Sequence, residues 1–368
     1  MMMFWVCTNI GNIIIYWQKF TIFAAGMKRL SIILLGILAA ASAFAQQTHI
    51  DSIWVDTRAT FHQQTTDGVY SSNFQGDYFN IHMSGQLSDN LTFRIRQRMN
   101  KGIIQDNPFN ATDFLWLKWQ ATNKWSFTFG KHPIMVGGYE VDSAPIDVYY
   151  YGAFTNRFYQ YYAFGVSATF EPVAGQAVSV QFCPSPISLG TQDSYSYNLY
   201  WNGQIFSHWK TIWSYNLVED ELHRKMNWVV LGNKFPMGPL VVDFDFVDRF
   251  AFTQTNPLSD WSLILKAILT LGNWNICTKV GYERNDASNI DPHWNHEWDT
   301  LVPASHIGSY DLVLPAGNDY LYYGAGLEYF PLGNDRLRLH FAYFADNHDR
   351  INNFDLGVTW RFRIYSWK

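Results

Sequence analysis

Charged residues are scarce in this sequence, and so are cysteines and long apolar segments. Asp, Glu, Lys and Arg make up 15% of its 368 residues, against roughly 25% in soluble domains. After residue 45 the longest uncharged stretch, 172–192, is interrupted by Pro184 and Pro186, so no apolar run reaches the roughly 20 residues of a membrane helix. This composition argues against both an ordinary soluble domain and a helical membrane protein.

Two cysteines, Cys183 and Cys277, follow residue 45. The alternation of the surrounding residues predicts that both face inward on distant strands. We expect no disulfide between them, because bridged Cα atoms lie within about 7 Å of each other.

The front of the chain predicts secretion. Residues 27–45 contain Lys28 and Arg29, an apolar core at 31–41 and the small-residue site Ala43-Phe44-Ala45, the pattern of a signal peptide. Residues 1–26 precede Met27, and we interpret them as a mis-assigned upstream start; a longer leader or a membrane anchor is the alternative. We expect residues 46–368 to form a single domain.

The predicted mature chain is acidic. It retains 23 basic against 31 acidic residues, a net charge of about −8. A negative balance argues against nucleic acid as a partner.

Alternation of side chains with a period of two is clearest at the end of the chain, NFDLGVTWRFRIYSW at 353–367. One face of this predicted strand carries Leu356, Val358, Trp360, Phe362 and Ile364, and the other carries Asp355, Gly357, Thr359, Arg361 and Arg363. Successive strand residues point to opposite sides. A strand with one apolar, aromatic face and one charged face is typical of a barrel wall between lipid and water.

The same pattern predicts an all-β fold, a 16-stranded antiparallel transmembrane β-barrel. The predicted strands are 52–62, 76–87, 91–100, 112–120, 125–132, 160–170, 176–183, 195–205, 209–218, 225–234, 239–248, 260–271, 274–284, 320–330, 336–345 and 353–365. Every second connection is a short turn rich in Pro, Gly, Asn and Asp. A soluble β-sandwich would also alternate, but the aromatic content of 18% and the signal peptide favour a barrel, and a barrel of this size encloses an aqueous channel.

The segment GKHPIMVGGYEVDSAPIDVYYYGAF, 130–154, resembles the phosphate-selective porin O and P family in its Bacteroidetes branch. FGVSATF at 164–170, VQFCPSP at 180–186 and LGVTWRF at 356–362 are similar to the same group. The resemblance implies an outer-membrane porin of Gram-negative bacteria, usually a homotrimer, with its third outer loop folded into the lumen. That loop is 133–159 by the strand count.

The loop departs from the family in charge. Basic residues at the pore are associated with phosphate selectivity in the family, whereas 133–159 contains Glu140, Asp142 and Asp147 against Arg157 alone. The phosphate specificity is therefore not transferred from the resemblance.

Charged residues on the predicted inward faces are the candidate pore-lining residues, because such charges set which ions pass a channel. The basic candidates are Arg58, Arg94, Arg96, Arg98, Arg336, Arg338, Arg361 and Arg363, and the acidic ones are Glu140, Asp142, Asp147, Asp243 and Asp245. A basic wall opposite an acidic loop would create a transverse field that passes small ions of either sign. Alternatively, the charges pair with each other and the arginines hold the loop in place.

Other motifs give weaker indications. The tyrosines at 149–151, 159, 161 and 162 could form a sugar-stacking path, but interfacial or loop packing is the simpler interpretation. His293, His296 and Glu297 do not have the spacing of a zinc protease, and His348 with Asp349 lies at a predicted loop. We expect no enzyme, no metal and no cofactor.

The sequence therefore predicts an outer-membrane porin for passive diffusion of small hydrophilic solutes and ions. Its expected partners are these solutes, outer-membrane lipid, the barrel-assembly machinery that reads the last strand, and two further copies of the chain. A phosphate- or anion-selective channel is one alternative. A plugged barrel that acts as a surface adhesin or scaffold is another.

Overall fold

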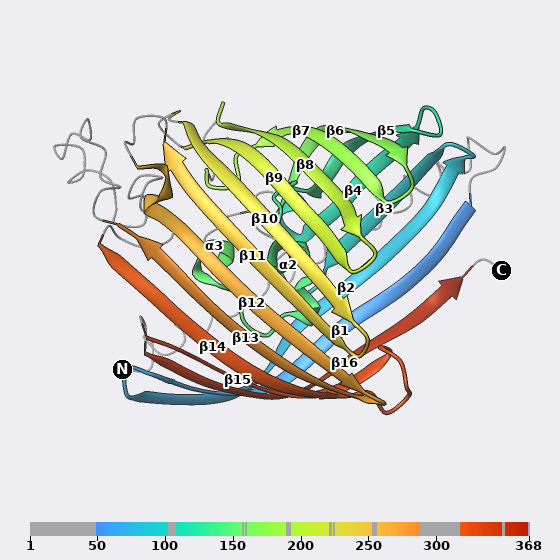
Figure 1. Ribbon diagram of the computed structural model, residues 1–368. Helices are drawn as coiled ribbons and strands as arrows, with labels where there is room; N and C mark the ends of the chain where they lie inside the picture. Colours follow the sequence, from blue (N-terminus) through green and yellow to red (C-terminus); the bar gives the residue numbers. More distant parts are fainter. Residues whose placement is uncertain are drawn as a thin grey trace, which may run out of the picture.

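A computed structural model of the chain describes residues 49–101, 108–156, 158, 160–188, 193–220, 223, 225–251, 256–286, 317–347 and 350–366. The predicted signal peptide and the residues before it lie outside these ranges. Within them, sixteen antiparallel strands follow one another in sequence order, and the first pairs with the last to close a barrel (Figure 1). The predicted fold class is confirmed.

The strands are β1 His49–Thr66, β2 Val69–Ser88, β3 Leu91–Arg98, β4 Thr112–Gln120, β5 Trp125–Pro133, β6 Tyr162–Val173, β7 Gln176–Pro184, β8 Tyr195–Phe206, β9 Trp209–Glu219, β10 Lys225–Met237, β11 Leu240–Ala251, β12 Asp260–Leu271, β13 Trp274–Asn285, β14 Asn318–Tyr329, β15 Leu337–Asp346 and β16 Ile351–Ser366. Short helical turns are η1 Pro108–Ala111, α2 Tyr139–Asp142, η2 Pro145–Asp147, α3 Ala153–Asn156 and η3 Pro257–Ser259. None of the helices in the described ranges is long and apolar enough to cross a membrane.

The first hairpin differs from the sequence prediction, which left 63–75 between strands. Instead, β1 continues to Thr66 and β2 begins at Val69, joined by Asp67 and Gly68 alone. Both turn residues have positive φ, 48° and 83°, as the two-residue hairpin turn with a right-handed strand twist requires. The prediction was wrong here because the hydrophobic alternation fades in this polar hairpin while the Asp-Gly turn signal remains.

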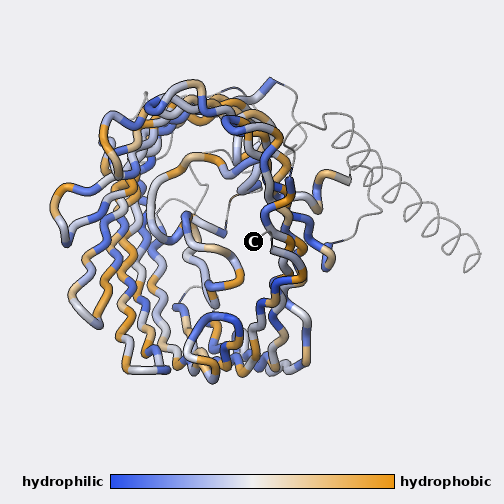
Figure 2. Tube along the Cα trace, turned by 90° about the vertical axis from the view of Figure 1, so that its right-hand side faces the viewer, coloured by the Kyte–Doolittle hydropathy of each residue, from blue (hydrophilic) through white to orange (hydrophobic). Residues whose placement is uncertain are grey.

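The outer face of the barrel is apolar, and its inner face carries many buried polar side chains beside a buried apolar cluster that includes Phe154 and Trp228. Exposed outward side chains include Leu199, Phe341 and Leu356, at 49%, 44% and 60% exposure. Inward ones such as Asn198, Asn216 and Glu283 are buried. Hydrophobic and hydrophilic residues alternate along the strands in Figure 2. Such a wall suits lipid on one side and a polar lumen on the other.

Closure between β1 and β16 uses polar pairs on the lumen face. Asp56 lies opposite Arg361, and His62 lies opposite Asp355. The His62 Nδ1 and Asp355 Oδ1 atoms are 2.6 Å apart. Closure leaves no strand edge open to lipid, where an unpaired backbone group would be costly. Cys183 and Cys277 are both free thiols.

Candidate functional site

The connection between β5 and β6, residues 134–161, runs inside the ring of strands (Figure 2), and α2 and α3 belong to it. We call it the internal segment; its residues 157 and 159 lie outside the described part. It contacts inward-facing side chains on several sides of the lumen.

A ladder of amide and hydroxyl side chains on β7, β8 and β9 holds the start of the internal segment. The Asn216 amide donates to Asn198 Oδ1 over 2.7 Å, and the Asn198 amide donates to Gln181 Oε1 over 2.9 Å. The same ladder binds backbone: Met135 N–H donates to Gln181 Oε1 and Gly137 N–H to Ser214 Oγ. These bonds satisfy backbone groups that burial would otherwise leave without partners.

Glycines allow this close approach. A Cβ on Gly137 would lie 2.8 Å from the Ile212 carbonyl oxygen, and one on Gly232 of β10 would lie 2.7 Å from Gly138 Cα. Gly138 also has a φ of 93°, a conformation that favours glycine. The Gly-Gly pair of the motif is thus explained by backbone contact with the wall.

Two buried wall carboxylates bind the first amides of the helical turns. Asp245 on β11 accepts from Tyr139 N–H (2.9 Å) and Glu140 N–H (2.8 Å), at the start of α2. Glu283 on β13 accepts from Ala153 N–H (2.6 Å) and Phe154 N–H (3.0 Å), at the start of α3. The first amides of a helix have no partner within it, so each carboxylate fixes one end of the internal segment to the wall.

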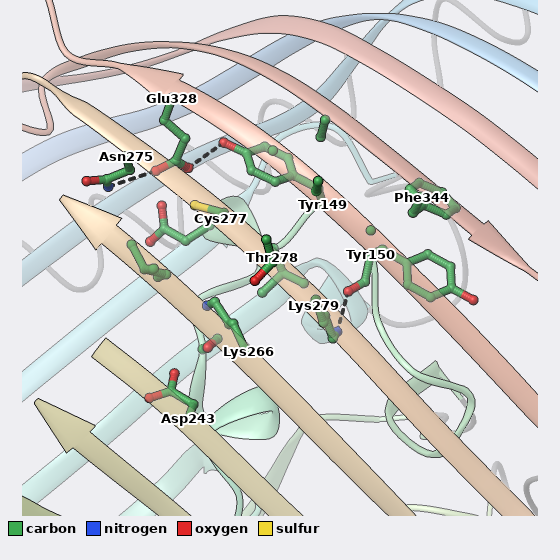
Figure 3. A pocket seen from close by; sticks show the side chains of 18 of the residues that line it. Tyr149, Tyr150, Asp243, Lys266, Asn275, Cys277, Thr278, Lys279, Glu328 and Phe344 are labelled. Atoms are coloured by element: carbon green, nitrogen blue, oxygen red, sulfur yellow. Dashed lines mark hydrogen bonds between the residues drawn. The ribbon is translucent and has the colours of Figure 1, made fainter. Parts of the chain in front are cut away.

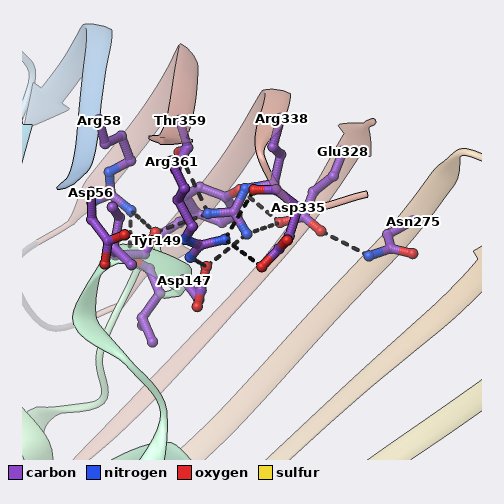
Figure 4. A network of polar contacts seen from close by, with 12 residues as sticks. Asp56, Arg58, Asp147, Tyr149, Asn275, Glu328, Asp335, Arg338, Thr359 and Arg361 are labelled. Atoms are coloured by element: carbon purple, nitrogen blue, oxygen red, sulfur yellow. Dashed lines mark hydrogen bonds and ion pairs between the residues drawn. The ribbon is translucent and has the colours of Figure 1, made fainter. Parts of the chain in front are cut away.

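Arginines of β1, β15 and β16 hold the middle of the segment (Figure 4). Asp147 lies 2.9 Å from Arg338 Nη1 and 2.5 Å from Arg361 Nη2. Arg338 also lies 3.3 Å from Glu328 of β14. Arg58 donates to the backbone carbonyls of residues 146 and 148 over 3.2 and 2.9 Å. These cations are therefore bound by the segment itself.

Glu140 is paired as well. Its Oε2 lies 2.8 Å from Lys279 Nζ on β13, and its Oε1 accepts the Gly152 N–H over 2.6 Å. Lys279 also donates to the Tyr150 carbonyl over 2.6 Å. Asp142, the third acidic residue of the segment, is exposed and has no ion pair among the described residues.

The predicted arginine ladder on β3 is split. Arg96 Nε and Arg98 Nε lie 3.0 and 2.6 Å from the shared carboxylate of Asp113. Arg94 has no ion pair in the described part of the chain; its guanidinium carbon lies 4.7 Å from the Phe114 ring centre and 5.6 Å from that of Trp54. Cations over aromatic faces are held weakly compared with paired ones.

The remaining candidates lie apart from this group. Arg336 is exposed in the turn before β15, and Arg363 is exposed near the end of β16. Asp243 on β11 lies 3.5 Å from Lys234 on β10. Arg157, Tyr159, His293, His296, Glu297, His348 and Asp349 fall outside the described residues.

Sequence reasoning missed the lysines of the opposite wall, Lys234, Lys266 and Lys279, which lie on the lumen faces of β10, β12 and β13. Lys266 is the single basic residue of its strand, within LILKAIL at 263–269. An isolated charge at an inward position within such a strand was the available signal, and the arginine clusters obscured it.

A cavity of about 350 Å³ lies between the internal segment and β11–β16. Figure 3 shows Tyr149 and Tyr150 of the segment on one side and Lys266, Cys277 and Lys279 of the wall around it. The cavity combines aromatic faces with groups of both charges.

These features define a class. A closed sixteen-strand barrel with an apolar outside, a polar lumen and a chain segment held across it is the architecture of an outer-membrane porin. Residues 52–198 match the model of the family described as phosphate-selective porin O and P. The resemblance seen in the sequence is thereby confirmed, and the chain is a passive channel of the Gram-negative outer membrane.

Solved porins share the fold at low sequence identity. OmpT of Vibrio cholerae in its trimer form has a TM-score of 0.57 and 11% identity, over 86% of this chain and 100% of that one. The anion-selective porin from Comamonas acidovorans has a TM-score of 0.55 and 9% identity, over 86% and 100%. OmpF of Salmonella typhi, in complex with daunomycin, has a TM-score of 0.57 and 12% identity, over 85% and 98%. No protein of curated function matches the sequence significantly.

Proposed function

We propose that small hydrophilic solutes and ions diffuse through the lumen past the internal segment, with weak selectivity between cations and anions. The observation that carries this is the pairing of charges: Glu140 with Lys279, and Asp147 with Arg338 and Arg361. A paired carboxylate and cation present little net field to a passing ion. The acidic segment and the basic wall thus largely neutralise one another.

This proposal assigns the candidate residues two roles. Arg58, Arg338, Arg361, Asp147, Glu140 and Asp245 position the internal segment and so set the width of the passage. Arg94 and Asp142 carry charge toward solutes. It gives the protein no catalytic step.

An anion-selective channel is the second candidate, and one observation favours it. Arg94 is half-buried and forms no ion pair with the described residues, so no carboxylate directly offsets its charge. A structurally similar porin, that of Comamonas acidovorans, is described as anion-selective, and phosphate selectivity gives the matching family its name.

Trimer formation is also part of the proposal. The similar OmpT barrel is described in a trimer form, and the exposed apolar outer wall of this chain could pack against a second copy within the membrane. Analytical ultracentrifugation of the detergent-solubilised barrel would test this, with a mass of one chain contradicting it.

The deciding experiment is planar-bilayer recording of purified residues 46–368 under a salt gradient, with and without phosphate. We expect open-channel currents and a reversal potential close to that of a non-selective pore. Strong anion selectivity with block by millimolar phosphate would favour the second candidate instead. A silent bilayer with a correctly folded barrel would support the plugged scaffold and contradict both channel proposals.

A further inference from the structure

A row of charged residues crosses four adjacent strands on the lumen face. Lys234 of β10 lies opposite Asp243 of β11, Asp243 opposite Lys266 of β12, and Lys266 opposite Lys279 of β13. Directly opposed side chains on one face are near neighbours, with Cβ atoms about 5 Å apart. The row therefore gathers three ammonium groups and one carboxylate on one wall.

Partners satisfy all but one member of this row. Asp243 lies 3.5 Å from Lys234, and Lys279 lies 2.8 Å from Glu140 of the internal segment. Lys266 has neither a hydrogen bond nor an ion pair within the described residues, although it is half-buried. Asp243, the carboxylate directly opposite Lys266, already pairs with Lys234. The row therefore supplies no separate counter-ion for the half-buried ammonium group of Lys266.

Lys266 opens into the cavity beside the internal segment (Figure 3). The carboxylates that line the same cavity are engaged: Glu328 binds Arg338, Tyr149 and Asn275, and Asp245 binds two backbone amides. The two lining arginines, Arg338 and Arg361, are held by Asp147. Among the four cations that line the cavity, Lys266 is thus the one without an ion pair in the described residues.

Apolar and aromatic side chains also line the cavity, besides Asp243 and Lys279, the charged cross-strand neighbours of Lys266. Ile264 and Ile268 flank it on β12, and Tyr150 faces Phe344 of β15 with ring centres 4.2 Å apart. Tyr322 lies against Tyr150 as well, edge to face at 5.3 Å. Ligand pockets typically pair such apolar and aromatic walls with a few polar groups that fix orientation.

We propose that this cavity binds small organic carboxylates that carry an apolar or aromatic body, with the carboxylate on Lys266 and the body against Tyr150 and Phe344. The inference rests on the proposed function, because it names a solute class for the same lumen. Inorganic phosphate is a poorer fit, since it offers several acceptor oxygens and no apolar surface, whereas the cavity offers one uncommitted ammonium group and aromatic faces.

Isothermal titration calorimetry on the folded barrel in detergent tests the proposal without depending on conductance. The probes are benzoate, acetate, benzyl alcohol and benzylammonium, which separate the charge from the ring. We expect benzoate to bind most tightly. We expect Lys266→Met to weaken benzoate binding about tenfold, the loss of one hydrogen bond to a charged group, and Lys266→Arg to retain most of it.

Lys210→Met is the matched control. Lys210 lies opposite Lys234 and so continues the row on β9, but it is exposed and does not line the cavity. Its loss should leave benzoate binding unchanged. Equal effects of Lys210→Met and Lys266→Met would overturn the site, as would benzyl alcohol binding as tightly as benzoate.

The outcomes for the site and for the channel are distinguishable. A barrel that conducts chloride but shows no benzoate binding overturns this inference and leaves the channel function intact. A barrel that is silent in bilayers but binds benzoate through Lys266 contradicts the channel function and supports the site. In a conducting barrel, benzoate should also reduce the ion current more in the wild type than in Lys266→Met.

Discussion

The lumen contains two sets of cations that differ in what they bind. On β15, β16 and β1, Arg338, Arg361 and Arg58 are all bound to the internal segment. On β3 and β12, Arg94 and Lys266 face the lumen without an ion pair in the described residues. The first set lies where the internal segment passes, whereas no carboxylate among the segment's described residues forms an ion pair with the second set.

The choice of residue fits the two roles. A guanidinium presents several donors in a rigid plane and can bridge a carboxylate and a carbonyl at once, as Arg338 does with Asp147 and the backbone of residue 146. A cation that binds and releases a solute must not already be bound by protein groups in this way. The comparison therefore separates positioning cations from cations available to solutes.

Both sets of cations keep their positions only in a closed barrel. We therefore expect the most severe effect from a change that prevents closure. Deletion of residues 353–368 takes away most of β16, which pairs with both β1 and β15. We expect the truncated protein to fail to insert in the outer membrane, because an open barrel exposes unpaired strand edges to lipid. Outer-membrane fractionation and heat-modifiable gel mobility measure this, and normal mobility of the truncated protein would refute it.

We expect the next largest effect when one of the arginines that bind the internal segment is replaced. Arg338→Met leaves the buried Glu328 without its cation and weakens the hold on Asp147. We expect a loss on the order of 3 kcal/mol in the free energy of unfolding, since removing one partner of a buried pair is costly. Conductance should also become larger and noisier as the internal segment loosens. Urea unfolding in lipid vesicles and single-channel recording measure the two effects.

Two variants of Asp245, the carboxylate that binds the first amides of α2, test its anchoring role. Asp245→Ala leaves the Tyr139 and Glu140 amides without a partner and should cost on the order of 2 kcal/mol. Asp245→Asn keeps an acceptor oxygen and should recover part of this loss in urea unfolding. If both variants raised anion selectivity equally without a change in stability, Asp245 would be a pore charge and not an anchor.

Most of the fold could be predicted from the sequence because a barrel strand repeats one simple rule. Outward Leu356 and Phe362 and inward Asp355 and Arg361 alternate without a break, so the sixteen strands and their order follow from local pattern alone. The exception is the first hairpin, where Phe74 is the only strongly apolar outward residue in a polar stretch and the alternation gives no signal.

The site was less predictable because its contacts join residues far apart in sequence. The inward position of Arg338 follows from its strand, but its pairing with Asp147, 191 residues earlier, depends on the path of the internal segment. That path is set by glycine contacts and by carboxylates such as Asp245 and Glu283, whose anchoring role no local pattern shows. Lys266 was within reach of the strand pattern and was overlooked because it stands alone.

The smallest change in stability is expected for Arg94, and a comparison with Arg96 on the same strand separates the two kinds of cation. Arg94→Met removes a charge bound to aromatic rings only, so the free energy of unfolding should change by less than about 1 kcal/mol while the reversal potential shifts toward cations. Arg96→Met removes a cation 3.0 Å from the buried Asp113 and should lower stability more, with a smaller shift in selectivity, because Asp113 offsets its charge. The same ion-selectivity shift in both variants would mean that net lumen charge, and not pairing, decides selectivity, and the distinction between positioning cations and cations available to solutes would no longer hold.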